Sequence, residues 1–396
     1  MTSGARAEAP DELDAWLRLL ASPGVGRGFA RRLLASFASP QAVFDAPHSA
    51  RRAVVGEAAA AGLRALPPGH DARLAATRAW LAGGGDRSLM VLGDPDYPAL
   101  LLHTADPPLL LYLWGRRGLI NAPSVAVVGS RTPTAQGRDN ARSFAAALVR
   151  HGWTVVSGLA RGIDGAAHEG ALQAGAGAVA DAADGAGTIA VIGTGIDGVY
   201  PLAHRGLSQR IAARGLLVSE LPLGSVPLPA HFPQRNRLIA GLSRGTLVVE
   251  AAERSGSLIT ARLAAEAGRE VMVIPGSILA RQSQGGHGLI RQGAALVASV
   301  EQVLEELGPP LAAPPPGATR AGEPSTGLFA PAATSGLDEP ADPVLRALGG
   351  DPCSLDALIA RCGWPGHQLL AHLLALELAG QVACLPGGLY QRVQAV

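Results

Sequence analysis

The sequence predicts an α/β domain built around a doubly wound, mostly parallel β-sheet, and two patterns between residues 124 and 276 carry this prediction. First, short apolar runs rich in β-branched residues alternate with Ala- and Leu-rich stretches of helical length. Second, the runs are apolar at successive positions, which is typical of strands covered on both faces. The expected strands are 125–129, 154–158, 188–193, 216–220, 246–251 and 271–276. In such a fold a ligand binds beyond the carboxyl ends of the strands.

The regions on either side differ in character. Residues 1–85 have helical patterning, and residues 86–308 hold the expected sheet domain. Residues 309–340 are rich in Pro, Ala and Gly and lack periodicity, so they indicate an extended linker. In residues 341–396 three helical patterns precede two short strand patterns joined at Gly387-Gly388, and this order is typical of a winged helix.

The N-terminal region contains a Gly-Val-Gly turn at 24–26, followed by a helix of small residues. This pattern resembles a helix-hairpin-helix, whose backbone N–H groups can hold a phosphate. An ordinary αα-hairpin with a glycine turn fits the pattern equally well. Between residues 18 and 80 nine arginines accompany only three acidic residues, and Arg27, Arg31 and Arg32 next to the turn slightly favour a DNA contact.

We interpret the C-terminal module as an interaction or packing unit rather than a reader of DNA sequence. A helix that reads base edges normally presents Arg, Lys, Asn or Gln. The expected helix at 367–379 offers only His367, Gln368, His372 and Glu377 as polar side chains. The Cys-x8-Cys spacing in this module is not that of a zinc finger, so no metal site is expected.

All 33 basic residues are arginine, and this count excludes several kinds of chemistry. Without lysine the chain has no Walker A phosphate loop, no Schiff base and no lysine general base. A bound anion must therefore be held by backbone N–H groups, by helix N-termini or by arginine, whose planar fork suits phosphate. The three cysteines are sparse, the N-terminus lacks an apolar leader, and no apolar run approaches the about 18 residues of a membrane helix, so we expect a cytoplasmic protein.

Three expected strand ends carry glycine and hydroxyl residues, two of them together with an arginine, and each precedes an expected helix. The groups are Gly129, Ser130 and Arg131 after the first strand, Ser157, Gly158 and Arg161 after the second, and Ser255, Gly256, Ser257 and Thr260 after the fifth. Asp164 is expected to cap the helix that follows the second strand. Because the carboxyl ends of parallel strands meet at one edge, we expect an anion-binding groove there.

A fourth segment, 231–237, lies in a Pro-rich loop between the fourth strand and the next helix. It places Arg235, Asn236 and Arg237 close to Phe232. Single-stranded nucleic acid needs this combination, because the charges hold its backbone and the ring stacks on a base. Taken alone, the segment slightly favours the alternative that Phe232 fills the core while one arginine forms an ion pair.

Two short motifs point to other chemistry, but their context argues against both. The G-x-G-x-x-G pattern at 193–198 follows a strand, as in a dinucleotide site, but Pro201 lies where the helix should already run, and the helical pattern begins only near His204. The G-x-S-x-G pattern at 241–245 ends a helix, whereas a nucleophile elbow follows a strand. Glu250 is expected to bond loop N–H groups. No catalytic constellation emerges, so we expect a binding protein without a cofactor.

In this order, these segments resemble the DNA-processing protein A (DprA/Smf) family of bacteria over about residues 93–293. The matching segments are DPDYPALL, DPPLLLYLWG, VAVVGSR, SGLARGIDGAAHEGAL, TIAVIGTGIDGVYP, LLVSELPLG, FPQRNRLIAGLS, VVEAAERSGSLITARLAAEAGREVMVIPG and GGHGLIRQGA. GSR, RNRLIAGLS and SGSLITA together are highly specific. The outer regions match more loosely, the low-complexity segment 173–187 is an unusual insertion, and residues 228–230 are neutral where some relatives carry a lysine.

The resemblance implies an extended Rossmann-like fold that binds single-stranded DNA without enzymatic activity. It also implies a homodimer formed through the α/β domain and a mediator that loads the RecA recombinase onto single strands in natural transformation. By the same resemblance, Arg131 grips a phosphate and Phe232 stacks on a base. The residues implied to line the same groove are Gly129, Ser130, Ser157, Gly158 and Arg161, and those implied to hold either their own loop or the strand are Arg235, Asn236 and Arg237.

The alternative function is that of a nucleotide-metabolising enzyme, similar to a phosphoribohydrolase, which uses the SGSLIT edge on a nucleoside monophosphate. Such an enzyme needs a pair of carboxylates at the sugar, whereas the sequence places arginines and a phenylalanine along the expected groove.

Overall fold

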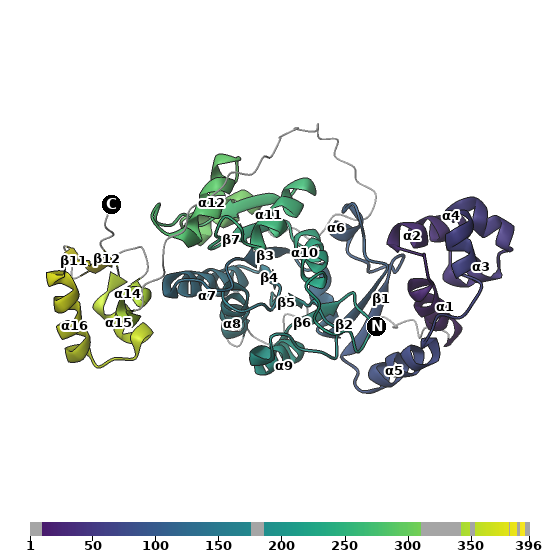
Figure 1. The fold of residues 1–396 in the computed structure, drawn as a ribbon, viewed down its shortest axis with the longest axis horizontal. Coiled ribbons are helices and arrows are strands. Elements are labelled where there is room, and N and C mark those ends of the chain that lie inside the picture. The colour runs from purple at the N-terminus through teal and green to yellow at the C-terminus, as the bar shows by residue number, and fades with distance from the viewer. Residues whose placement is uncertain are drawn as a thin grey trace.

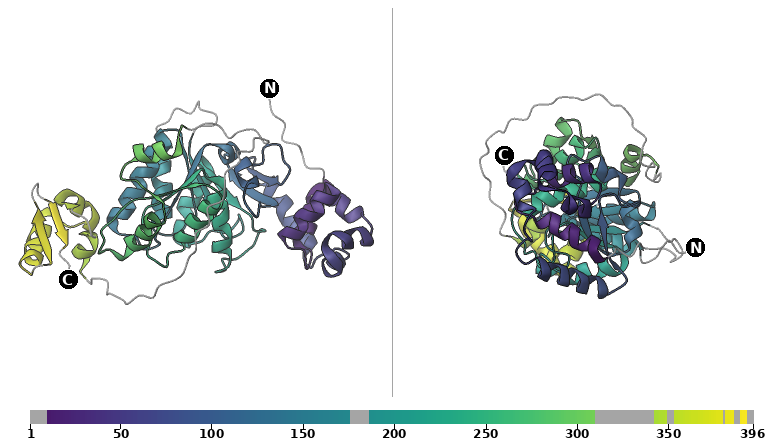
Figure 2. Two further views of the ribbon diagram at one scale, coloured as in Figure 1. Left: turned by 90° about the horizontal axis from the view of Figure 1, so that it is seen from above. Right: turned by 90° about the vertical axis from the view of Figure 1, so that its right-hand side faces the viewer.

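A computed structural model of the chain describes residues 10–175, 186–309, 342–348, 353–379, 381–385 and 389–392. The helical N-terminal region and the small C-terminal unit lie at opposite ends of a central α/β domain (Figures 1 and 2). The predicted fold class is confirmed. Nearly all of the expected linker at 309–340 and most of the segment 173–187 lie outside the described residues.

Five helices form the N-terminal region and enclose a core that includes the fully buried Leu19, Leu33 and Leu63. The helices are α1 (Pro10–Ala21), α2 (Arg27–Phe37), α3 (Pro40–Asp45), α4 (His48–Gly62) and α5 (His70–Ala82). In the turn between α1 and α2, Gly24 has a φ of +75°, a conformation that favours glycine.

The central sheet has the strand order β1-β2-β6-β5-β4-β3-β7-β8-β9. The six expected strands are present and pair in parallel: β3 (Ser124–Val128), β4 (Thr154–Ser157), β5 (Thr188–Val191), β6 (Leu216–Ser219), β7 (Gly245–Val248) and β8 (Glu270–Val273). Three further strands lie outside the expected set. These are β1 (Arg87–Val91) and β2 (Leu110–Gly115), which are antiparallel at one edge, and β9 (Ala295–Leu296) at the other edge.

Alternate side chains of the central strands face opposite helical layers, as a doubly wound sheet requires. In β3, Ala126 and Val128 share a core with helices α10 and α11, whereas Val125 and Val127 share a core with α7 and α8. The helices of this domain are α6 (Ala99–Leu102), α7 (Ala135–Arg150), α8 (Ile163–Gly175), α9 (Arg205–Arg214), α10 (His231–Leu242), α11 (Ser257–Glu266), α12 (Arg281–Arg291) and α13 (Val300–Leu307), with 3-10 turns η1 (Arg117–Asn121) and η2 (Leu202–His204). Within the described residues, no helix is long and apolar enough to cross a membrane.

The C-terminal unit has the order expected of a winged helix. Its elements are α14 (Pro343–Leu348), β10 (Cys353–Ser354), α15 (Leu355–Cys362), α16 (Gly366–Leu378), β11 (Val382–Leu385) and β12 (Leu389–Arg392), and its sheet order is β10-β12-β11. The hydroxyl of Ser354 caps α15 by accepting a hydrogen bond from the Ala357 N–H at 3.3 Å. An ion pair of 3.1 Å between Arg361 and Asp139 of α7 joins this unit to the central domain.

His168 on α8 is fully buried in the central domain, with Nδ1 2.7 Å from the Thr188 hydroxyl. Burial lowers the pKa of His168 from its ordinary value of 6.5 to about 3. Between these values the unfolded chain binds a proton that the folded protein does not, so the stability from this group is present above pH 6.5 and is lost as the pH falls.

We therefore expect the protonation of His168 alone to reduce the free energy of unfolding by about 1 kcal/mol between pH 6.5 and 5.5. Urea unfolding at the two pH values measures this, and the His168→Gln variant should show a drop smaller by that amount. An equal drop in both proteins would contradict the assignment.

Candidate nucleic-acid interface

The strand order of the sheet changes direction at β3. Strands β4, β5 and β6 follow on one side of β3, and β7 and β8 lie on its other side. The topological switch point is therefore between β3 and β7, and open α/β sheets bind ligands at the carboxyl ends of the strands that flank this point.

The loop after β3 is fixed to the end of β7. The Ser130 N–H donates to the Glu250 carbonyl at 2.7 Å, and a Cβ on Gly129 would meet the Ile163 side chain at 2.6 Å. The Glu250 carboxylate accepts hydrogen bonds from the Thr134 N–H, at 2.9 Å, and from the Thr134 hydroxyl. This confirms that Glu250 bonds loop N–H groups, and the arrangement leaves Arg131 exposed at the sheet edge.

The loop after β4 differs in two respects from the expectation. Ser157 is fully buried and its hydroxyl donates to the Val127 carbonyl at 2.7 Å, so this hydroxyl faces the sheet and not the groove. Asp164 does not cap α8 but accepts from the N–H groups of Gly158 and Ala160, at 3.2 and 3.3 Å. Burial raises the pKa of Asp164, and the positive charge of the Arg235 guanidinium offsets this rise only in part.

Arg235 holds the same loop from its buried side. It is 7% exposed, and its Nη2 donates to the Gly158 carbonyl at 2.8 Å. A Cβ on Gly158 would lie 1.5 Å from the guanidinium, so the loop approaches the arginine as closely as only glycine permits. Burial lowers the pKa of Arg235 to about 10, which leaves it charged at neutral pH. Of the two roles implied for Arg235, the geometry favours holding the loop.

Phe232 lies in the first turn of α10, not in the loop expected at 231–237. Pro233 is compatible with this position because the first N–H groups of a helix have no intrahelical partner. The Phe232 ring is half-buried, and the Arg131 guanidinium carbon lies 5.5 Å from the ring centroid. The structure thus brings together the cation and the aromatic side chain that the sequence analysis singled out.

The turn before α11 lies next to α10. The Asn236 amide donates to the Gly256 carbonyl at 3.4 Å, and the hydroxyls of Ser255 and Ser257 are 2.7 Å apart. Ser257 and Thr260 are buried, whereas Gly256 is exposed. This turn therefore presents backbone and the half-buried Ser255 to solvent, and Asn236 holds the turn against α10.

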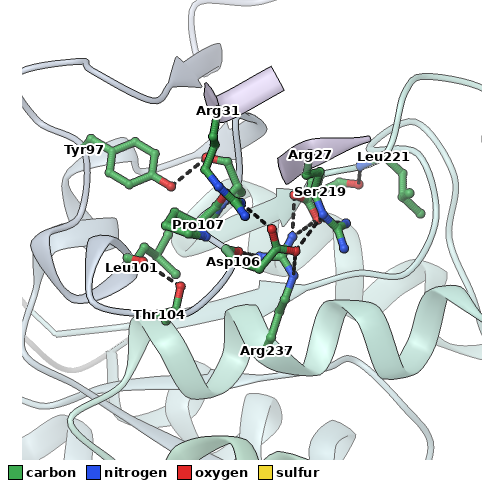
Figure 3. A network of polar contacts seen from close by, with 12 residues as sticks. Arg27, Arg31, Tyr97, Leu101, Thr104, Asp106, Pro107, Ser219, Leu221 and Arg237 are labelled. Carbon is green, nitrogen blue, oxygen red and sulfur yellow. Dashed lines mark hydrogen bonds and ion pairs between the residues drawn. The ribbon is translucent and has the colours of Figure 1, made fainter. Parts of the chain in front are cut away.

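Arg237 belongs to an ion network between the sheet domain and the N-terminal helices (Figure 3). Its guanidinium contacts both Glu220 carboxylate oxygens and the backbone carbonyl of Asp106. From α2, Arg27 lies 2.7 Å from the Asp106 carboxylate and 3.3 Å from that of Glu220, and Arg31 also pairs with Asp106. Burial of Asp106 is outweighed by the Arg31 hydrogen bond and the charges of Arg237 and Arg27, so the pKa of Asp106 is lowered.

The network changes the interpretation of the N-terminal arginines. Arg27 and Arg31 pair with carboxylates of the sheet domain, which argues against a DNA contact at these two positions. Arg32 is exposed, with its guanidinium over the Phe29 ring at 4.6 Å, so a DNA contact at Arg32 stays a prediction. Asp106 and Glu220 both stand in segments that carry the family resemblance, but the sequence does not show that their partners are arginines of α2 and α10.

The G-x-G-x-x-G pattern at 193–198 and the G-x-S-x-G pattern at 241–245 lie in the structural contexts that the sequence predicts for them. After β5, the 193–198 segment continues through Pro201, and α9 begins only at Arg205. The Asp197 carboxylate accepts from the Gly224 N–H at 3.0 Å. Ser243 is fully buried at the end of α10, and its hydroxyl donates to the Ile239 carbonyl at 2.9 Å. Neither segment therefore has the geometry of a dinucleotide site or a nucleophile elbow.

Comparisons with known proteins agree with this architecture. The family described as DNA recombination-mediator protein A matches residues 88–308, and the DprA winged helix domain matches residues 330–388. Protein Smf of Escherichia coli is 42% identical over 74% of this chain and 74% of its own length. DNA processing protein DprA of Streptococcus pneumoniae is 48% identical over 54% of this chain and 72% of its own length. The crystal structure of DNA processing protein A from Streptococcus pneumoniae aligns with a TM-score of 0.63 at 36% identity, covering 75% of this chain and 98% of that one. The chain therefore belongs to the DprA/Smf family of DNA-processing proteins.

Proposed function

We propose that this protein binds single-stranded DNA at the carboxyl edge of β3, β4 and β7. The observation that carries the proposal is the position of Arg131 above Phe232, with 5.5 Å between the guanidinium carbon and the ring centroid, beside the topological switch point. Single-stranded DNA is recognised by cations that track its phosphates and by aromatic rings that stack on its bases. Arg131 supplies the cation and Phe232 supplies the aromatic ring, and the two side chains lie together.

The charge of the exposed arginines supports this proposal. Arg131 and Arg161 are exposed on neighbouring loops, and neither takes part in an ion pair with any other described residue. By contrast, Arg27, Arg31 and Arg237 each form an ion pair with Asp106, Glu220 or both. Arginines without a carboxylate partner keep their full attraction for phosphate.

The carboxylates near the strand ends argue for binding rather than catalysis. Glu250 and Asp164 accept hydrogen bonds from loop groups, Asp197 accepts from the Gly224 N–H, and Glu220 pairs with arginines. An enzyme that cleaves a nucleoside monophosphate needs two carboxylates directed at the sugar. These four are directed at the protein itself, and the exposed Glu253 after β7 is a single carboxylate, not a pair. We therefore favour a binding protein over the phosphoribohydrolase-like alternative.

Family membership supports a more specific role. We infer that the protein acts in the cytoplasm as a recombination mediator, which protects single strands and loads the RecA recombinase in natural transformation and recombination. We also infer a homodimer formed through the Rossmann-like domain, with the winged-helix module as an interaction unit. Analytical ultracentrifugation tests the dimer, and RecA filament assembly on strands precoated with single-strand-binding protein tests the loading.

The Arg131→Ala variant tests the DNA site. We expect weaker binding to oligonucleotides of every sequence, and a plot of log K against log salt whose slope is flatter by about 0.7, because one phosphate contact is lost. Fluorescence anisotropy at several salt concentrations measures both effects.

The matched control is Arg150→Ala. This variant removes an exposed arginine at the C-terminal end of α7, which precedes β4 and so lies toward the amino ends of the parallel strands. This variant should retain the wild-type slope. An Arg131→Ala protein with wild-type slope and affinity would refute the proposed site, and a wild-type protein that releases ribose 5-phosphate from a nucleoside monophosphate would establish the alternative.

A further inference from the structure

Phe232 is not the only aromatic side chain at the proposed DNA site. The ring of Tyr200 lies beside that of Phe232, with 5.5 Å between the centroids and 50° between the planes. The two residues come from different loops, since Tyr200 follows β5 and Phe232 opens α10 after β6. Tyr200 is 48% exposed, and the Phe232 ring that it contacts is half-buried.

The loop that carries Tyr200 is held in place by hydrogen bonds. The Gly195 N–H donates to the Ser225 carbonyl at 3.0 Å, and the Ser219 hydroxyl donates to the Thr194 carbonyl at 2.6 Å. The Gly198 N–H closes a turn onto the Gly195 carbonyl at 2.9 Å. These bonds tie the loop after β5 to the loop after β6, so Tyr200 is presented from a fixed frame.

Apolar side chains continue along the same two loops. Leu202 is 78% exposed, Val226 is 62% exposed and Leu228 is 47% exposed. Exposed apolar side chains that gather at one place mark an interaction site more often than single ones do. Leu202 lies in η2 after β5, and Val226 and Leu228 lie between β6 and α10, so all three stand in the two segments that are hydrogen-bonded to each other.

The occupant of this surface follows from its continuity with the Arg131–Phe232 pair. Single-strand binding sites place successive bases on successive aromatic side chains, because every base offers a π-face whatever its identity. We propose that Tyr200 is a second base-stacking residue, so that the bound strand runs from the β3–β7 switch point across the ends of β4 and β5 to the loop after β6. This inference rests on the proposed DNA-binding function and adds the direction of the strand.

Three substitutions separate a stacking role from a packing role. Tyr200→Phe keeps the ring, Tyr200→Leu keeps an apolar side chain without a π-face, and Tyr200→Ala removes both. For an unstructured oligothymidine we expect Tyr200→Phe to bind as the wild type does, and both other variants to raise Kd about tenfold with an unchanged salt slope. Leu66→Ala, at an apolar residue 50% exposed in the N-terminal region, is the control and should leave Kd unchanged.

Two further measurements address the base directly. On a fully abasic strand of the same length, the wild type and Tyr200→Ala should bind equally, because no base is left to stack. In Tyr200→Trp, the added tryptophan should lose fluorescence when the oligothymidine binds and should keep it with the abasic strand. Wild-type affinity in Tyr200→Leu, or an unchanged tryptophan signal on binding, would overturn the inference and leave Tyr200 as a cover for Phe232.

The outcome can be told apart from a failure of the proposed function. If the wild type does not bind single strands, the function itself is refuted. If Arg131→Ala weakens binding while Tyr200→Ala, with an unchanged melting temperature, does not, the function stands and only the path across Tyr200 is refuted.

Discussion

Replacing Phe232 with alanine is expected to raise the Kd for single-stranded DNA by about 5- to 150-fold, which corresponds to about 1–3 kcal/mol. The reason is that the half-buried ring lies at the sheet edge beneath the Arg131 guanidinium, where a base can stack on it. Phe232→Tyr keeps the ring and should retain the affinity. Equilibrium titrations with a labelled oligonucleotide measure both variants at one fixed salt concentration.

The ring of Phe232 also packs against the protein, so stability must be followed in parallel. A Cβ on Gly193 would lie 3.2 Å from this ring, and Tyr200 touches it. Phe144→Ala is the matched control, since Phe144 is a half-buried phenylalanine of α7 that packs against the core on that side of the sheet. It should lower the melting temperature without changing Kd. The same result for Phe232→Ala would show that Phe232 is a packing residue only.

Neutralising Glu220 is expected to cost about 3 kcal/mol of folding free energy, because it removes the carboxylate that pairs with the largely buried Arg237. The Glu220 and Arg237 side chains are only 15% and 13% exposed, and Arg27 shares the same carboxylate. After Glu220→Gln, three arginines face Asp106 alone. Urea unfolding and limited proteolysis between the N-terminal helices and the sheet measure the loss.

Glu169→Gln provides the comparison. Glu169 pairs with Arg142, and both side chains are more than one-third exposed, so this loss should cost less than about 1 kcal/mol. If the two variants are equally stable, the network contributes no more than an ordinary surface ion pair and the N-terminal helices are held by apolar contacts alone.

The six parallel strands could be predicted because each is apolar on both faces, a pattern that belongs to the strand itself. The antiparallel edge could not be predicted in the same way. Strand β2 pairs with β6, and Leu113 lies opposite Val218, about a hundred residues away in the chain. Nothing in the local pattern around Leu113 identifies this partner, so the sequence does not predict a strand there.

The proximity of Arg131 to Phe232 could also be predicted, because both residues stand in motifs that end or follow strands of one sheet. An ion pair of one arginine in 231–237 was also among the alternatives, and Arg237 forms it, but the sequence could not show which arginine pairs or with which partner. A sequence shows that an arginine is present, but not whether a phosphate or a carboxylate will meet it. Arg237 reaches Asp106, 131 residues away, and Arg235 reaches the Gly158 carbonyl, 77 residues away. Only the packing of α10 against both partners settles these contacts.

Helix α10 carries both Phe232 in its first turn and Arg237 in its second, about 7.5 Å apart along the helix axis. The ring lies at the proposed DNA site, and the guanidinium is joined through Glu220 and Asp106 to α2. Because a helix moves as a rigid body, a rotation of the N-terminal helices that displaces these carboxylates also displaces the ring. The proposed DNA site and the ion network with the N-terminal helices therefore share a single helix, α10.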